Sequence, residues 1–121
     1  MMNAKKQPKK NLLKLRRKAR SRKKLQGTSD RPRLSVFRSE KHIFVQVIDD
    51  IKGQTILSAS SFEKGSNTRA NVEVCYEVGK RIASRCKEHK IANVVFDKNG
   101  SIYHGRVKAV AEGARESGLN F

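Results

Sequence analysis

Two short clusters in the sequence combine planar rings with cations, the residue types that contact nucleic acids. The first, residues 37–42, reads FRSEKH, and the second, residues 103–106, reads YHGR. Rings and guanidinium groups can stack on unpaired bases, while cations and hydroxyls can contact phosphates and 2′-OH groups. The alternative interpretation is that Phe37 and Tyr103 are core aromatics with polar edges. The candidate RNA-binding residues in the two clusters are Arg38, Lys41, His42, Tyr103, His104 and Arg106.

The YHGR cluster opens a predicted helix, so its first backbone N–H groups have no partners within that helix. A helix N-terminus also carries partial positive charge, which favours a phosphate. Arg106 adds a planar cation that can bind phosphate or a base edge in two places, and Gly105 permits close approach of a backbone. We therefore expect this cluster to form a fixed contact that positions RNA.

Residues 1–29, hereafter the arm, contain twelve Lys or Arg residues and no acid, and the first carboxylate is Asp30. The arm carries +12 of the net charge of +17, and residues 30–121 carry the remaining +5. Such a run of cations repels itself and needs an external polyanion, which nucleic acid supplies with release of counterions. The predicted RNA-binding cations are Lys5, Lys6, Lys9, Lys10, Lys14, Arg16, Arg17, Lys18, Arg20, Arg22, Lys23, Lys24, Arg31 and Arg33.

Other interpretations of the arm are a solvated tail, a basic DNA-packaging segment and a membrane-surface segment. The membrane interpretation is the weakest, because the arm has no Phe, Trp or Tyr and only a short apolar stripe. The arm also lacks the continuous apolar core of a secretory signal. The chain has no apolar run of the length that spans a membrane.

Catalytic motifs are absent from the sequence: there is no nucleophile–base set, P-loop or Gly-rich dinucleotide fingerprint. The three histidines fall in separate predicted elements, so no metal site is predicted. Asp49, Asp50, Glu63 and Asp97 leave open a metal-dependent nuclease of ribonuclease H-like topology. Such enzymes place an acid on the first strand, whereas that strand here reads LSVFR. Asp49 and Asp50 are also typical turn residues.

The elements that must position these residues form one small domain after the arm. Alternating apolar residues predict strands over 34–38, 43–49 and 54–60, joined as an antiparallel meander. Helical periodicity runs over 69–89, a fourth strand over 91–97 completes a parallel crossover, and a last helix covers 105–117. The predicted fold is α/β: a mixed four-stranded sheet with two packed helices, residues 30–121, and a basic, partly helical arm. That arm helix would begin at Asn11, run to about Leu25 and order on its partner.

Cys75 and Cys86 lie eleven positions apart on the predicted long helix. This separation is about 16 Å along a helix axis, whereas a disulfide needs Cα atoms within about 7 Å. Two unpaired thiols fit a reducing, cytoplasmic compartment.

The segments RPRLSVFRSEKHIFVQVIDD and FDKNGSIYHGRVKAVAEGARESGLNF are similar to those of a bacterial ribosomal family, protein eighteen of the large subunit. The resemblance covers the whole chain, and YHGRVKA is its most specific motif. The loop from Glu63 to Arg69 is shorter than in many members.

The resemblance implies a non-enzymatic structural constituent of the ribosome in the cytoplasm, without cofactor, small-molecule substrate or membrane partner. The family binds 5S ribosomal RNA and helps attach it to 23S ribosomal RNA in the central protuberance. Protein five of the large subunit is among the implied neighbours. The family fold is a mixed sheet whose fourth strand is parallel to the first, in agreement with the pattern of elements.

Overall fold

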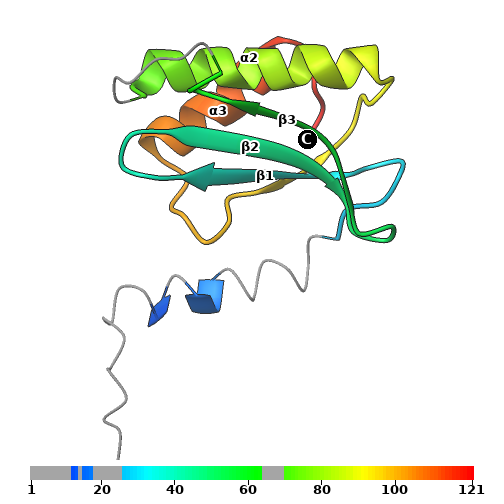
Figure 1. Cartoon of the computed structure of the whole chain (residues 1–121), viewed down its shortest axis with the longest axis horizontal. Coiled ribbons are helices and arrows are strands. Elements are labelled where there is room, and N and C mark those ends of the chain that lie inside the picture. Colours follow the sequence, from blue (N-terminus) through cyan, green and yellow to red (C-terminus); the bar gives the residue numbers. More distant parts are fainter. Residues whose placement is uncertain (1–11, 14, 18–25, 64–69) are drawn as a thin grey trace, which may run out of the picture.

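The fold is a two-layer α/β arrangement, with two helices packed on one face of a four-stranded sheet (Figure 1). The computed structural model describes residues 12–13, 15–17, 26–63 and 70–121. The elements are, in order, β1 (Arg33–Arg38), β2 (Ile43–Asp49), β3 (Gln54–Ser60), α2 (Val72–Glu88), β4 (Val95–Asp97) and α3 (Gly105–Glu116).

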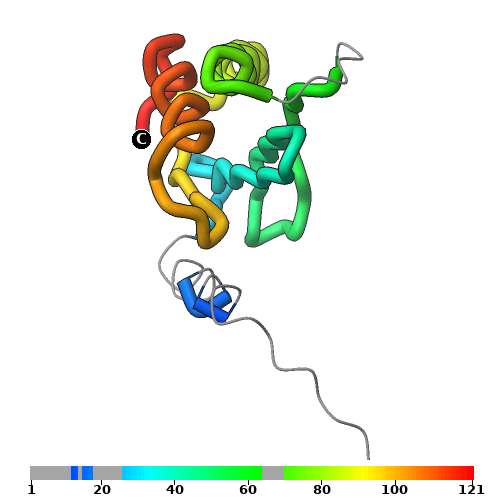
Figure 2. The backbone as a smooth tube through the Cα atoms, turned by 90° about the vertical axis from the view of Figure 1, so that its left-hand side faces the viewer, coloured from blue at the N-terminus to red at the C-terminus, as the bar shows by residue number. Residues whose placement is uncertain are grey.

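The sheet has the order β3-β2-β1-β4, and its pairing confirms the predicted topology. β1 and β2 are antiparallel, as are β2 and β3, whereas β4 lies parallel to β1. Figure 2 shows α2 and α3 above the same face of this sheet. The opposite face is left uncovered by both helices, and the β2 side chains on it are half-buried.

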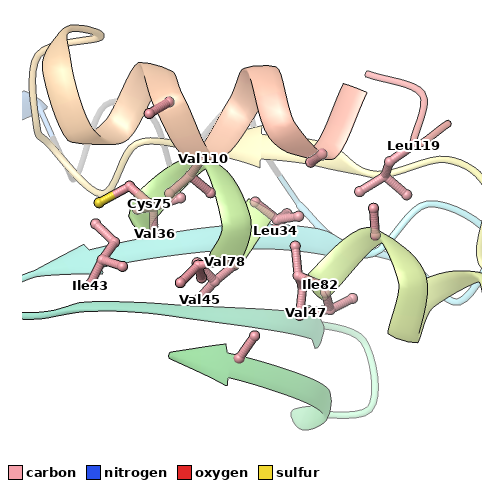
Figure 3. Close-up of a cluster of buried hydrophobic side chains, with 14 of the residues drawn as sticks. Leu34, Val36, Ile43, Val45, Val47, Cys75, Val78, Ile82, Val110 and Leu119 are labelled. Carbon is pink, nitrogen blue, oxygen red and sulfur yellow. The ribbon is translucent and has the colours of Figure 1, made fainter. Parts of the chain in front are cut away.

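Strict alternation in β2 explains why only one sheet face forms the core. Ile43, Val45 and Val47 are fully buried, while the residues between them are half-buried. In register with them, Val36 pairs with Val45 and Leu34 with Val47. Figure 3 shows these side chains meeting residues of α2 and α3, so the apolar stripe of each helix closes the core.

Two glycines allow the helices to pack backbone against backbone. A Cβ on Gly79 of α2 would lie 2.1 Å from the carbonyl oxygen of Val110 in α3. A Cβ on Gly113 of α3 would lie 2.1 Å from the carbonyl oxygen of Tyr76 in α2. Any larger residue at either position would force the helices apart.

The ends of the helices follow capping rules. Asn71 caps α2 by accepting a hydrogen bond from the Val74 N–H at 2.9 Å. At the end of α3, Gly118 has a φ of 102°, and the Leu119 N–H donates to the Ala114 carbonyl. Gly118 thus adopts the left-handed conformation that favours glycine just after a helix, and Leu119 is buried against the core.

Two details differ from prediction. The fourth strand is confined to Val95–Asp97, because residues 92–94 pair instead with Asn120 near the C-terminus. The long helix, predicted over 69–89, begins at Val72, which is 53% exposed.

Cys75 and Cys86 are free and buried, which confirms the absence of a bridge between them. Burial raises the pKa of each thiol to about 11, so both are protonated at neutral pH. Across the described residues, none of the helices combines the length and apolar character needed to cross a bilayer.

Candidate nucleic-acid interface

The structure brings the two predicted clusters together. The Arg106 guanidinium, in the first turn of α3, donates to the Ser39 carbonyl at 2.9 Å and the Glu40 carbonyl at 3.3 Å. Both carbonyls belong to the turn between β1 and β2. Residues 37–42 and 103–106 therefore form one continuous surface, here called the hairpin–helix surface, although they are more than sixty positions apart in sequence.

Cations on this surface face solvent. Arg38, Lys41 and His104 are exposed, whereas His42, Tyr103 and Arg106 are half-buried. The turn itself is fixed, because the Ser39 N–H donates to the His42 carbonyl at 2.9 Å. Exposed cationic side chains on a fixed backbone suit contacts with phosphates.

The start of α3 offers backbone donors to an anion. His104 has extended backbone dihedrals at the N-cap, and Gly105 follows with a φ of 55°. Within the described part of the chain, no side chain caps this helix and no acid lies in its first turn. The first N–H groups and the positive end of the helix dipole are therefore free of competing carboxylates.

Tyr103 packs against an aromatic cluster formed by Phe96 of β4 and the C-terminal Phe121. Its ring meets Phe96 edge-on, with centroids 6.2 Å apart, and Phe121 stacks on Phe96 at 5.2 Å. Arg115 lies over the Phe121 ring at 4.4 Å and donates to the Tyr103 hydroxyl at 3.4 Å. The ring of Tyr103 is thus packed against other aromatic rings, while its hydroxyl lies at the polar edge of this cluster.

Arg31 and Arg33, both predicted to bind RNA, lie in different environments. Arg31 is exposed, but Arg33 is 8% exposed and is bonded to Asp50 at 2.9 Å and Asp97 at 2.8 Å. The hydrogen bond to Asp50, opposed by desolvation, is the main cause of a raised Arg33 pKa. The guanidinium of Arg33 is committed to these carboxylates, so we exclude Arg33 from the proposed binding surface.

The carboxylates considered for catalysis have structural partners. Asp49 accepts bonds from the Ile51 and Lys52 N–H groups and from the Ser29 hydroxyl, and the Ser29 bond is the main cause of its lowered pKa. Asp97 accepts bonds from Arg33 and from the Asn99 N–H. Over the described ranges, no three His, Cys, Asp or Glu residues gather as a metal site would require.

In the arm, residues 12–13 and 15–17 are helical and exposed, and they include two predicted RNA-binding residues, Arg16 and Arg17. Arg17 donates from Nε to the Gly100 carbonyl at 3.1 Å, in the turn after β4. The Asn11 cap and the other predicted cations lie outside the described residues: Lys5, Lys6, Lys9, Lys10, Lys14, Lys18, Arg20, Arg22, Lys23 and Lys24.

The segment that joins the arm to β1 is bonded to the turn after β2. Gly27 is buried, its N–H donates to Asp50 at 2.7 Å and its carbonyl accepts the Asp50 N–H at 3.0 Å. The Ser29 hydroxyl donates to Asp49 at 2.8 Å. Residues 27–29 are therefore attached to the globular part of the molecule.

Sequence reasoning missed an aromatic platform, defined here as Phe37, His42, Phe44 and Phe62. Phe44 and Phe62 stack nearly parallel, at 8° and 6.4 Å between centroids, and His42 meets Phe62 edge-on at 5.1 Å. The alternation in β2 already placed Phe44 opposite the core face. The position of Phe62, beyond the end of β3, had no comparable signal.

The comparison with known proteins is unambiguous at family level. The family model described as ribosomal L18 of archaea, bacteria, mitochondria and chloroplasts matches residues 8–121. The large ribosomal subunit protein uL18 of Desulfosudis oleivorans is 55% identical over 119 residues, covering 93% of this chain and 96% of that protein. The uL18 protein of Sorangium cellulosum is 57% identical over 110 residues, covering 88% of this chain and 92% of its own length.

Proposed function

Because the chain belongs to the L18 family of large-subunit ribosomal proteins, we propose that it binds 5S ribosomal RNA and helps attach it to 23S ribosomal RNA in the central protuberance. Membership gives it the role of a ribosomal structural constituent, with ribosomal RNA and other large-subunit proteins as partners. Protein five of that subunit is the neighbour that we propose on 5S RNA, in the cytoplasm.

We infer two modes of RNA contact. The arm, residues 1–29 with twelve cations and no acid, supplies electrostatic attraction that is independent of sequence. The hairpin–helix surface supplies a fixed contact that sets the orientation of the RNA. The observation that carries this second role is the pair of bonds from Arg106 to the β1–β2 turn, which joins both clusters into one site.

A binding comparison tests the choice of ligand. The purified chain should retain 5S ribosomal RNA, but not duplex DNA of equal length, at moderate salt. Equal retention of both would favour a DNA-packaging protein, since that function needs only the basic arm. Magnesium-dependent cleavage of the RNA would instead support the nuclease of ribonuclease H-like topology.

Replacing Arg106 tests the fixed contact. Arg106→Ala should weaken 5S RNA binding by about 1–3 kcal/mol, the range for one specific Arg contact. Because Arg106 also bonds to Ser39 and Glu40, the free energy of unfolding should fall by about 1 kcal/mol. Arg106→Lys should recover only part of the affinity, since Lys lacks the planar fork.

Lys108→Ala provides the matched control for this variant. Lys108 also lies on α3 and pairs at 3.7 Å with Glu112 of its own helix. Its replacement by Ala removes the same charge as Arg106→Ala. Its loss should change RNA affinity much less than the loss of Arg106. Equal affinities for Arg106→Ala and Lys108→Ala, measured by titration at fixed salt, would refute a specific role for Arg106.

A further inference from the structure

Hydrogen bonds hold the aromatic platform at the end of the sheet where β1 and β3 finish and β2 begins. The Ser61 hydroxyl contacts His42 Nδ1 at 3.2 Å and accepts the Ile43 N–H at 3.0 Å. The Ser61 N–H in turn donates to the Ile43 carbonyl at 3.0 Å. These bonds extend the pairing of β3 with β2 by one residue, and Phe62 follows directly. The stack of Phe62 on Phe44 is therefore set by backbone pairing.

This stack leaves an apolar ring partly exposed to solvent. Phe62 is 48% exposed, although Phe44 and His42 both contact its ring. Phe44, on which Phe62 stacks, alternates with the buried residues of β2 and so lies on the face of the sheet that α2 and α3 leave uncovered (Figure 1). A held, exposed aromatic face of this kind gains free energy when a planar apolar partner covers it.

The charges around the platform select the partner. Arg38 and Lys41 are exposed next to Phe37 and His42 in the chain. Glu63, the acid that follows Phe62, bonds to Arg81 at 2.9 Å and Arg85 at 2.7 Å, so its charge is compensated. A partner with a planar apolar face and negative charge fits this setting, and an unpaired base with its flanking phosphates has both properties.

We propose that Phe62, supported by Phe44 and His42, is a stacking site for an unpaired base of RNA, with Arg38 and Lys41 binding the adjacent phosphates. The proposal rests on the proposed function and extends the hairpin–helix surface, which already includes Arg38, Lys41 and His42, to Phe44 and Phe62. Phe62 contributes the outer face on which the base lies. Phe44 and His42 act as positioning residues that fix the plane of that ring.

The test compares two replacements of Phe62 in the full chain bound to 5S ribosomal RNA. Phe62→Leu keeps apolar bulk but removes the aromatic face, and should weaken binding about 5- to 150-fold, the range for one base–aromatic stack. Phe62→Tyr keeps the ring and should bind like the unchanged chain. The salt dependence should stay the same in both, because stacking releases no counterions.

Ile51→Ala is the matched control, since Ile51 is a 65% exposed apolar residue in the turn between β2 and β3. Its affinity for 5S RNA should be unchanged. Phe62→Leu binding as tightly as the unchanged chain, or Phe62→Tyr losing as much as Phe62→Leu, would overturn the stacking site while leaving the proposed function intact. Loss of binding to another large-subunit protein, with RNA affinity preserved, would also overturn it. If the unchanged chain itself fails to bind 5S RNA, both proposals are refuted.

Discussion

At the scale of single residues, Arg31 and Arg33 are two positions apart in the sequence, but Arg31 is exposed and Arg33 is buried. Arg33 compensates Asp97, which is fully buried, and also bonds to Asp50. Arg33→Ala should therefore lower the free energy of unfolding by about 3–5 kcal/mol, because it leaves a buried charge without its partner. Arg31→Ala removes an exposed cation and should change stability by less than about 0.5 kcal/mol. Chemical denaturation of both variants measures the difference, and equal stabilities would contradict the structural role of Arg33.

Glu63 gives the stability a dependence on acid pH. Its hydrogen bond with Arg85, helped by Arg81, lowers the pKa of Glu63 below the usual 4.5. A lowered folded-state pKa contributes stability above the unfolded-state value, and that contribution is lost as the pH falls through the folded-state pKa. Stability should therefore decline below pH 4.5, and Asp49, whose pKa is lowered from 3.8, should extend the decline.

Glu63→Gln separates this effect from general acid unfolding. The variant should be less stable than the unchanged chain at neutral pH, because Gln has no charge to pair with Arg81 and Arg85. The difference between the two proteins should shrink below pH 4.5, as Glu63 becomes protonated. Melting curves across this range measure both quantities, and a constant difference would show that the ion pairs contribute nothing.

Site residues could be predicted from sequence only where local pattern determined their setting. The cations of the two clusters are recognisable by type; Arg38, Lys41 and His104 are exposed, and their contacts with RNA stay a prediction. The burial of Arg33 depends on two acids that are distant in sequence, so residue type alone could not distinguish it from Arg31. The same holds for Phe62, whose place depends on pairing beyond a strand end.

At the scale of elements, the contact of α2 with α3 depends on Gly79 and Gly113. Gly→Ala normally stabilises a helix interior by about 1 kcal/mol. Here the added Cβ would lie 2.1 Å from a backbone oxygen of the facing helix, so the helices must separate. Gly79→Ala and Gly113→Ala should each lower the free energy of unfolding by about 1–3 kcal/mol.

Ser84→Ala is the control for helix propensity, because Ser84 is exposed on α2. This change should leave stability equal or slightly higher. A stabilising effect of Gly79→Ala in the same denaturation assay would contradict the close backbone packing of the two helices.

The elements themselves were largely predictable, because alternation and capping are local. The bounds of β2 and β3 match the expected residues 43–49 and 54–60. The fourth strand was predicted too long because its first residues resemble a strand but pair with Asn120, a contact across nearly thirty positions. Neither glycine was recognisable as a site of helix contact, since that role depends on the facing element.

At the scale of the whole molecule, we propose that residues 1–25 of the arm contribute affinity but not stability, whereas residues 26–29 also contribute stability. Removal of residues 1–25 should leave thermal unfolding nearly unchanged. Removal of residues 1–29 should lower stability, because Gly27 and Ser29 bond to Asp50 and Asp49. Melting curves of the two truncated proteins test this division, and equal stabilities would show that residues 26–29 contribute as little to stability as the rest of the arm.

The salt dependence of 5S RNA binding tests the central claim, that the basic arm meets the phosphates of RNA. If about half of the twelve arm cations make such contacts, log K should fall with log salt at a slope of roughly −4 to −5. The slope should become much shallower after removal of residues 1–25, while the hairpin–helix surface keeps a weaker affinity for 5S RNA. A slope of roughly −1 for the full chain, unchanged by the truncation, would contradict the account, because it would mean that the arm cations do not bind the RNA.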